Sequence, residues 1–156
     1  MRKLLFIAMV IMMSAPSWAQ SDHDYIEMER SVLQTERKAV VADAMMFTDE
    51  EAKVFWPLYN EYTEKVYAVK TRRVDVIMDY AENYESLSDE KADELMQRSF
   101  KVQQDLLKLK LNYYKKFKKI ISPSKAVRYF QVESKIDAMV AAELALEIPL
   151  VETLKK

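Results

Sequence analysis

Apolar residues recur every three or four positions along most of this chain, and that spacing predicts α-helices. No stretch shows the alternation of apolar and polar residues that is typical of a strand. One long stripe follows Thr48 and consists of Phe55, Tyr59, Tyr62, Val66, Val69, Val76, Tyr80 and Tyr84. A second long stripe consists of Leu95, Val102, Leu106, Leu109, Tyr113, Phe117 and Ile120. The pattern predicts an all-α protein.

About four helices are expected. A weaker stripe predicts a first helix over about 24–45, and another predicts a last helix from Pro123 to near Pro149. The two central helices are separated only by the segment "NYESLSDEKADE" (83–94), in which Ser88 is the expected N-cap of the second. Because the connection is short, the two should form a long antiparallel hairpin, roughly 50 Å in length.

A repeated segment marks two of the helix starts. "MFTDEEAKVFW" (46–56) and "IISPSKAVRYF" (120–130) align without gaps, so Thr48 corresponds to Ser122 and Phe55 to Tyr129. Thr48 and Glu51 form a capping-box pattern. Ser122 is followed by Pro123, which is favoured at the first position of a helix. The duplication predicts that two chain reversals lie together at one end of the hairpin.

The first nineteen residues have the pattern of a secretory signal peptide. A basic pair precedes the apolar run Leu4–Met13, and small residues flank Trp18 at the expected cleavage point after Ala19. The alternative is a membrane anchor, but the run is shorter than the roughly 20 residues that a spanning helix needs. We therefore expect 1–19 to be removed and 20–156 to form a single exported domain with a formal charge of about −3.

Composition argues against an enzyme and against a cofactor. The chain has no Gly, no Cys and one His, so it lacks a phosphate-binding loop, a thiol and a conventional metal-ligand cluster. His23 is a weak metal candidate. Cleavage after Gln20 would make it the third residue, where it could bind Cu²⁺ or Ni²⁺ with the terminal amine. Cleavage after Ala19 would make it the fourth and remove that geometry.

The segment "KLKLNYYKKFKKIISPSK" (108–125) is the strongest local concentration of charge, with seven lysines and interleaved aromatic residues. Such a pattern can bind nucleic acid or an anionic membrane surface, although export argues against nucleic acid. The lysines can equally complement the dipole at the end of a helix. The opposite end of the hairpin, 79–94, is acidic.

The stretch "VFWPLYNEY" (54–62) is the most aromatic. Pro57 lies inside the predicted helix and should bend it. Trp56 lies about 100° away from the apolar stripe. It either packs beneath the first helix or lines a groove for a partner.

The repeated helix starts resemble the Leu-Thr-x-x-Gln motifs of the periplasmic Spy/CpxP-like family. Here the motifs read Phe47-Thr48-Asp49-Glu50-Glu51 and Ile121-Ser122-Pro123-Ser124-Lys125, and both lack the Gln. The resemblance implies that the two turns meet. An ion pair between Glu51 and Lys125 could then replace an amide contact. Otherwise Glu51 only closes its capping box and Lys125 is solvated.

By this resemblance we expect a periplasmic, ATP-independent chaperone or stress-associated binding protein that forms a homodimer and acts on unfolded clients or an envelope protein. The alternatives are a dedicated regulatory partner of an envelope sensor and a metal-responsive protein. Neither nucleic acid nor a membrane span is expected. The expected contact residues, chosen by type and exposure, are Trp56, Tyr67, Tyr114, Lys115 and Lys118.

Overall fold

The computed structural model describes residues 34–151 and divides the chain after Val40 into two units. Residues 34–40, the described part of the first unit, are helical and mostly exposed. The second unit begins with a helical turn at 41–45. The signal-peptide prediction and His23 fall outside the described residues.

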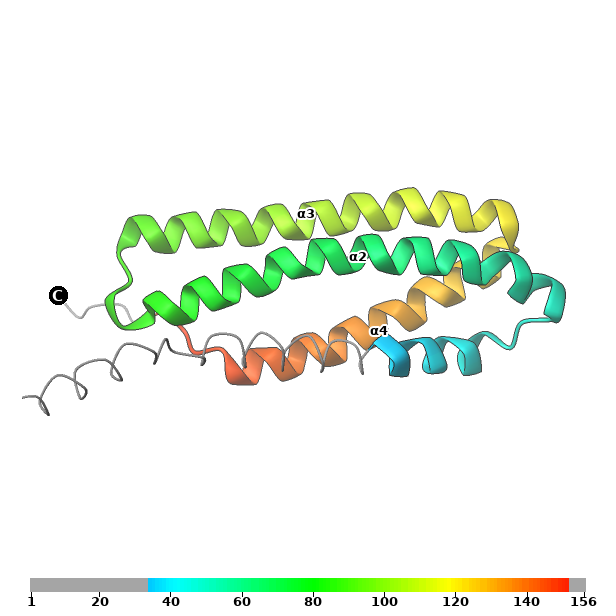
Figure 1. Ribbon diagram of the computed structural model, residues 1–156, viewed down its shortest axis with the longest axis horizontal. Coiled ribbons are helices and arrows are strands. Elements are labelled where there is room, and N and C mark those ends of the chain that lie inside the picture. Colours follow the sequence, from blue (N-terminus) through cyan, green and yellow to red (C-terminus); the bar gives the residue numbers. More distant parts are fainter. Residues whose placement is uncertain (1–33, 152–156) are drawn as a thin grey trace, which may run out of the picture. The chain divides into compact units, whose positions relative to one another are not determined.

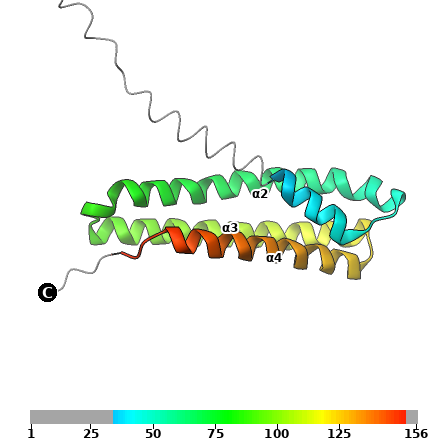
Figure 2. The same ribbon diagram turned by 90° about the horizontal axis from the view of Figure 1, so that it is seen from below.

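Three long helices build the second unit: α2 (Asp49–Asn83), α3 (Asp89–Ile120) and α4 (Pro123–Glu147). A short 3₁₀ helix, η1 (Tyr84–Ser86), joins α2 to α3. Figure 1 shows α2 and α3 side by side in opposite directions, with α4 running back from the end of α3. Figure 2 shows the same arrangement from below. The all-α class is confirmed, and the two central helices form a hairpin.

Side-chain caps define the three helix starts. The Thr48 hydroxyl accepts from the Glu51 amide at 3.3 Å, and the Glu51 carboxylate accepts from the Thr48 amide at 3.1 Å, which completes the capping box. Ser88 and Ser122 accept from the amides three residues later. Pro123 is the first residue of α4. Each cap satisfies a backbone donor that would otherwise have no partner within the helix.

The core is concentrated at the end of the hairpin where α2 and α4 begin. It contains mainly aromatic residues from all three helices, and it includes two residues of the turn at 41–45: Val41, Met45, Phe55, Tyr59, Tyr62, Val66, Tyr113, Phe117, Ile121, Ala126 and Tyr129. Phe55 and Tyr129, which are equivalent in the repeat, meet edge to face with ring centroids 5.2 Å apart. The duplicated segments therefore pack against each other.

Two details of the expected stripes differ in the structure. The apolar stripe predicts that Ile120 faces the core, but its side chain is 36% exposed. Ile121 is buried instead, because α3 ends at Ile120 and the chain turns there. Glu133 of α4 is 1% exposed, although it is ionisable. It lies between Tyr129 and Ile136 on the core-facing stripe, a position where the spacing alone predicts an apolar residue.

Candidate binding groove

An open groove of about 600 Å³ lies between α3 and α4. Its volume falls within the range of small-molecule and cofactor sites. The lining residues come from the second half of α3 and the first half of α4: Leu107, Lys110, Leu111, Tyr114, Val127, Phe130, Gln131, Ser134 and Lys135. The groove thus begins near the junction of the two repeated segments and runs toward the middle of the hairpin.

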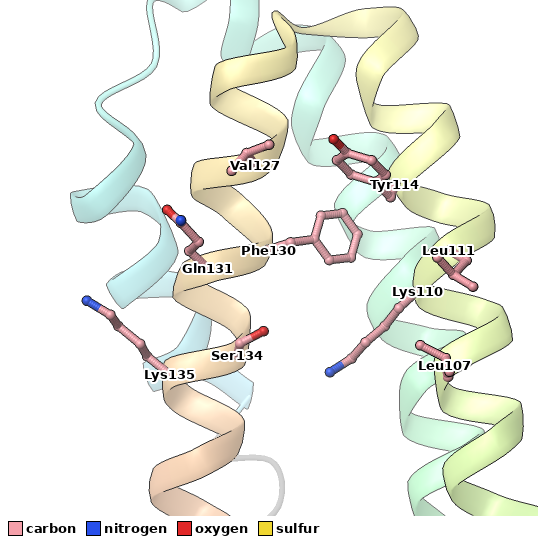
Figure 3. Close-up of a pocket in the computed structure, with 9 residues that line it drawn as sticks. All are labelled: Leu107, Lys110, Leu111, Tyr114, Val127, Phe130, Gln131, Ser134 and Lys135. Carbon is pink, nitrogen blue, oxygen red and sulfur yellow. The ribbon is translucent and has the colours of Figure 1, made fainter.

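Apolar side chains dominate the groove and remain accessible. Leu107 is 58% exposed, Leu111 53% and Val127 42%. Figure 3 shows Phe130 pointing from α4 toward α3, where its ring meets that of Tyr114 at right angles with centroids 5.6 Å apart. Exposed aliphatic residues gathered in one concave surface are a recurrent mark of a binding site, whereas single exposed residues are not.

Lysines add positive charge to the groove. The Lys110 ammonium donates to Asp137 of α4 at 2.7 Å, and Lys70 of α2 donates to the same carboxylate at 2.7 Å. Burial opposes ionisation of Asp137, but the charges of Lys70 and Lys110 outweigh it and hold the pKa of this carboxyl well below its usual range. Lys135 lies at the α4 edge of the groove and is exposed.

Three of the expected contact residues lie on α3 near the groove. Tyr114 is half-buried and lines it. Lys118 lies with its ammonium 4.6 Å from the centre of the Tyr114 ring, a cation–π contact that brings these two residues together. Lys115 is exposed on α3 but does not line the groove.

Trp56 and Tyr67 lie on α2, away from the groove. Trp56 is half-buried, packs against the core, and makes ring contacts with Phe47, Phe55 and Tyr59. Trp56 does not line this groove. Tyr67 is half-buried, and its carbonyl oxygen accepts from the Thr71 hydroxyl at 3.1 Å.

The two helix starts meet through Glu51 and Lys125. The Lys125 ammonium donates to the Glu51 carboxylate, and it also lies 5.6 Å from the centre of the Phe47 ring. This hydrogen bond from Lys125, together with the one from the Thr48 amide, lowers the pKa of Glu51. Glu51 therefore closes its capping box and makes the ion pair as well. Of the two alternatives that the sequence left open, the ion pair therefore holds, and the alternative in which Glu51 only closes its capping box and Lys125 is solvated does not.

Some lysines of 108–125 are engaged within the protein. Lys110 pairs with Asp137, Lys116 pairs with Glu61 at 3.1 Å, and Lys125 pairs with Glu51. The Tyr113 hydroxyl also donates to Glu61, and burial together with this carboxylate raises the pKa of Tyr113. The other four lysines of this segment, Lys108, Lys115, Lys118 and Lys119, are exposed.

The described part of the chain contains no cluster of three or more potential metal ligands. Nor does any helix within 34–151 have the length and apolar character needed to cross a membrane.

Sequence reasoning missed most of the groove. It selected Tyr114 but not Leu107, Leu111, Val127 or Phe130. A signal was present on α3, where a second apolar stripe runs beside the core stripe through Met96, Phe100, Leu107, Leu111 and Tyr114. One helix with two apolar stripes contacts more than one neighbour, or leaves one stripe available.

Comparison with known proteins gives no match: no family model matches the chain, and no curated protein or solved structure is significantly similar to it. The resemblance to the Spy/CpxP-like family therefore rests on the two degenerate motifs and on the order of the helices.

Proposed function

We propose that this protein is an exported, periplasmic, ATP-independent binding protein that holds apolar segments of partly unfolded clients in the groove between α3 and α4. The observation that carries the proposal is the exposure of Leu107, Leu111 and Val127 in one concave surface beside lysines. Apolar contact would supply affinity, and lysines would favour clients with acidic residues near the bound segment. The periplasmic location rests on the expected signal peptide.

The chemistry of the groove suits binding better than catalysis. Its polar groups are two lysines, one amide and two hydroxyls, and the Lys110 ammonium is already held by Asp137. An open apolar surface with few polar anchors tolerates many sequences, as a chaperone needs.

An aggregation assay tests the proposal. A client protein that unfolds on heating would be followed by light scattering, with and without equimolar protein, at low and high salt. We expect suppression that weakens at high salt, because screening removes the contribution of the lysines. A lack of suppression at several-fold excess over several clients would contradict the proposal and favour a single dedicated envelope partner instead.

Matched variants test whether the activity lies in the groove. Val127→Ser removes apolar surface from the groove wall, whereas Val54→Ser makes the same change on α2 outside it. The two valines are similarly exposed, at 42% and 45%. Val127→Ser should reduce suppression about threefold, and Val54→Ser should leave it unchanged. Equal effects of the two changes would place the activity elsewhere on the molecule.

A further inference from the structure

Two rows of exposed side chains run along the side of α3 that faces away from the core. The apolar row is more than half exposed and consists of Phe100, Leu107 and Leu111. The basic row is also exposed and consists of Lys108, Lys115 and Lys119. At 100° per residue, each row occupies an arc about 40° wide, and the rows lie about 80° apart. The midpoint between them lies about 180° from the buried residues of α3, so the two rows together form the outer face of this helix.

The positive charge of the outer face has little to offset it. Asp105 is the single acidic residue between Phe100 and Lys119, and it already accepts from Arg72 of α2 and from Lys101. In the part of the chain that the structure describes, no ion pair engages a lysine of the basic row. The acidic residues of α3 otherwise lie near its start, at the hairpin tip. The outer face therefore presents unneutralised ammonium groups beside exposed apolar side chains.

This combination restricts the kind of partner that fits. The partner must offer anionic groups to the basic row and an apolar region to the adjacent row, both along one convex helix. The surface of a bilayer with anionic lipid offers both, because its phosphate groups lie just above the boundary of the acyl chains. It also adapts to a convex helix without a matching shape. Helices that lie in the plane of this boundary have apolar residues on one side and lysines beside them.

From this juxtaposition we infer that the outer face of α3 docks on the surface of a membrane that contains anionic lipid, with the helix lying in the plane of the interface. The apolar row enters the boundary between the head groups and the acyl chains. The ammonium groups of the basic row bind lipid phosphates on one side of it. The hairpin tip, with its acidic residues, points away from the anionic surface.

Other polyanions fit the outer face less well. Nucleic acid would engage the basic row, but single-stranded forms bind by stacking bases on aromatic rings, and Phe100 is the single aromatic residue of the two rows. A folded acidic protein would need an apolar patch of its own that matches the apolar row. Binding by charge alone would leave that row in water, which is the difference that an experiment can detect.

This inference goes beyond the proposed function and uses different residues. Leu107 and Leu111 also line the groove, but Phe100 and the three lysines of the basic row do not. Variants at Phe100 and in the basic row therefore address membrane docking without changing the groove lining. Val127 lies in the groove wall on α4, so its variant addresses the groove alone.

Cosedimentation with vesicles provides the first test. The purified protein is mixed with vesicles of phosphatidylcholine, with or without phosphatidylglycerol as about one third of the lipid. We expect binding that requires phosphatidylglycerol and weakens at high salt. Every variant has the same N-terminal segment, so differences between variants report on the substituted side chains. Equal binding to both kinds of vesicle, or binding to neither, would overturn the inference.

Matched charge variants test the basic row. Lys115→Gln combined with Lys119→Gln should weaken vesicle binding about twentyfold, since each lysine near an anionic surface contributes roughly a fivefold factor. Lys53→Gln combined with Lys65→Gln makes the same change in net charge at exposed positions of α2 and should change binding less than about twofold. Equal losses in the two double variants would mean that net charge, and not the outer face of α3, attracts the protein to lipid.

Phe100→Ser separates membrane docking from binding by charge alone. It should weaken binding to the phosphatidylglycerol vesicles about fivefold, because it removes apolar surface from the interface. Val127→Ser should leave vesicle binding unchanged, although it reduces suppression of client aggregation; Phe100→Ser should do the reverse. Circular dichroism checks the helix content of each variant. If Phe100→Ser left vesicle affinity unchanged while the basic-row variant abolished it, the face would bind any polyanion, including an acidic protein, and the assignment to lipid would be wrong.

Discussion

Asp137 links three helices through ion pairs. Its carboxylate on α4 accepts from Lys70 of α2 and from Lys110 of α3, with both oxygens engaged. Its side chain is 21% exposed, and each lysine is 28% exposed. The triad is sheltered enough for the charges to interact strongly, and each charge has a partner.

We predict that Asp137→Asn lowers the free energy of unfolding by about 2 kcal/mol at pH 7, less than for a fully buried pair because the lysines are partly solvated. The pKa of Asp137 is lower in the folded protein than in the unfolded chain, where the pKa of an aspartate is about 3.9. The stabilisation is therefore complete above that value, and it is lost as the pH falls toward the folded-state pKa.

Urea unfolding at a series of pH values measures this contribution. The difference between the original protein and Asp137→Asn should be constant near neutral pH and should shrink below about pH 4. Asp75→Asn, at an exposed position of α2, is the control, and it should change stability by less than about 0.5 kcal/mol. A difference that persists unchanged to pH 2 would mean that the carboxylate charge is not the source of the stability.

At the residue scale, the sequence offered the Glu51–Lys125 ion pair as one of two alternatives, and it missed the ion pairs that form between other positions of the three helices. Glu51 and Lys125 could be matched because they occupy equivalent positions in the two segments. The Asp137 triad could not, because it depends on how three helices are rotated against one another. Glu133 is a second example. Its polarity predicts an exposed side chain, but it is buried because it lies on the core-facing stripe of α4.

Helix starts were more predictable than helix ends. Thr48, Ser88 and Ser122 were identified as N-caps from local sequence, and all three accept the expected amide hydrogen. Ends are usually marked by Gly, and this chain has none. The turn before α2 instead uses Met46, whose φ of 42° is in the left-handed region. A residue with a Cβ is strained at such a φ, and Gly is the residue that usually marks it. A Met at this position therefore does not reveal the turn geometry in the sequence.

We predict that Met46→Gly stabilises the protein by about 1 kcal/mol relative to Met46→Ala, because only Gly adopts positive φ without a Cβ clash. The side chain is 75% exposed, so its removal should cost little apolar burial. Chemical denaturation of the two variants measures the difference. Equal stability of the Gly and Ala variants would show that the turn relaxes to a negative φ.

The bend expected at Pro57 stays a prediction. α2 continues as one helix from Asp49 to Asn83 with Pro57 inside it, and Pro57 itself is exposed.

The groove was missed for a different reason. Its walls come from two helices, and the sequence of either helix alone does not show which of its apolar residues face the other helix.

The second unit, considered as a whole, has an uneven core. Aromatic packing fills the end where the repeated segments meet, whereas α2 has no fully buried side chain after Val66. At the hairpin tip, Asp79 accepts from Lys91 and Arg98, and Glu94 accepts from the same two cations. Hydrogen bonds from Lys91 and Arg98 lower the pKa of Asp79. The tip combines this charge network with the buried Leu95, whereas the other end is held by aromatic packing from all three helices.

This division predicts a gradient of local stability, because segments with few buried apolar contacts open at lower free energy than the core. Amides of 70–83 and 89–100 should exchange hydrogen faster than those of 55–66 and 110–117, as measured by mass spectrometry on peptides. Raising the salt concentration should speed exchange at the tip several-fold and have little effect at the core end, since screening weakens exposed ion pairs.

Arg98→Gln should reproduce the effect of salt at the tip, because it removes a partner of both Asp79 and Glu94. Arg73→Gln makes the same chemical change on α2 at a residue outside this network, and it should leave the exchange of 89–100 unchanged. Protection that is uniform along α2 and α3 would contradict the gradient. It would mean that the hairpin opens only as a whole, with the aromatic end and the charged tip forming one cooperative unit.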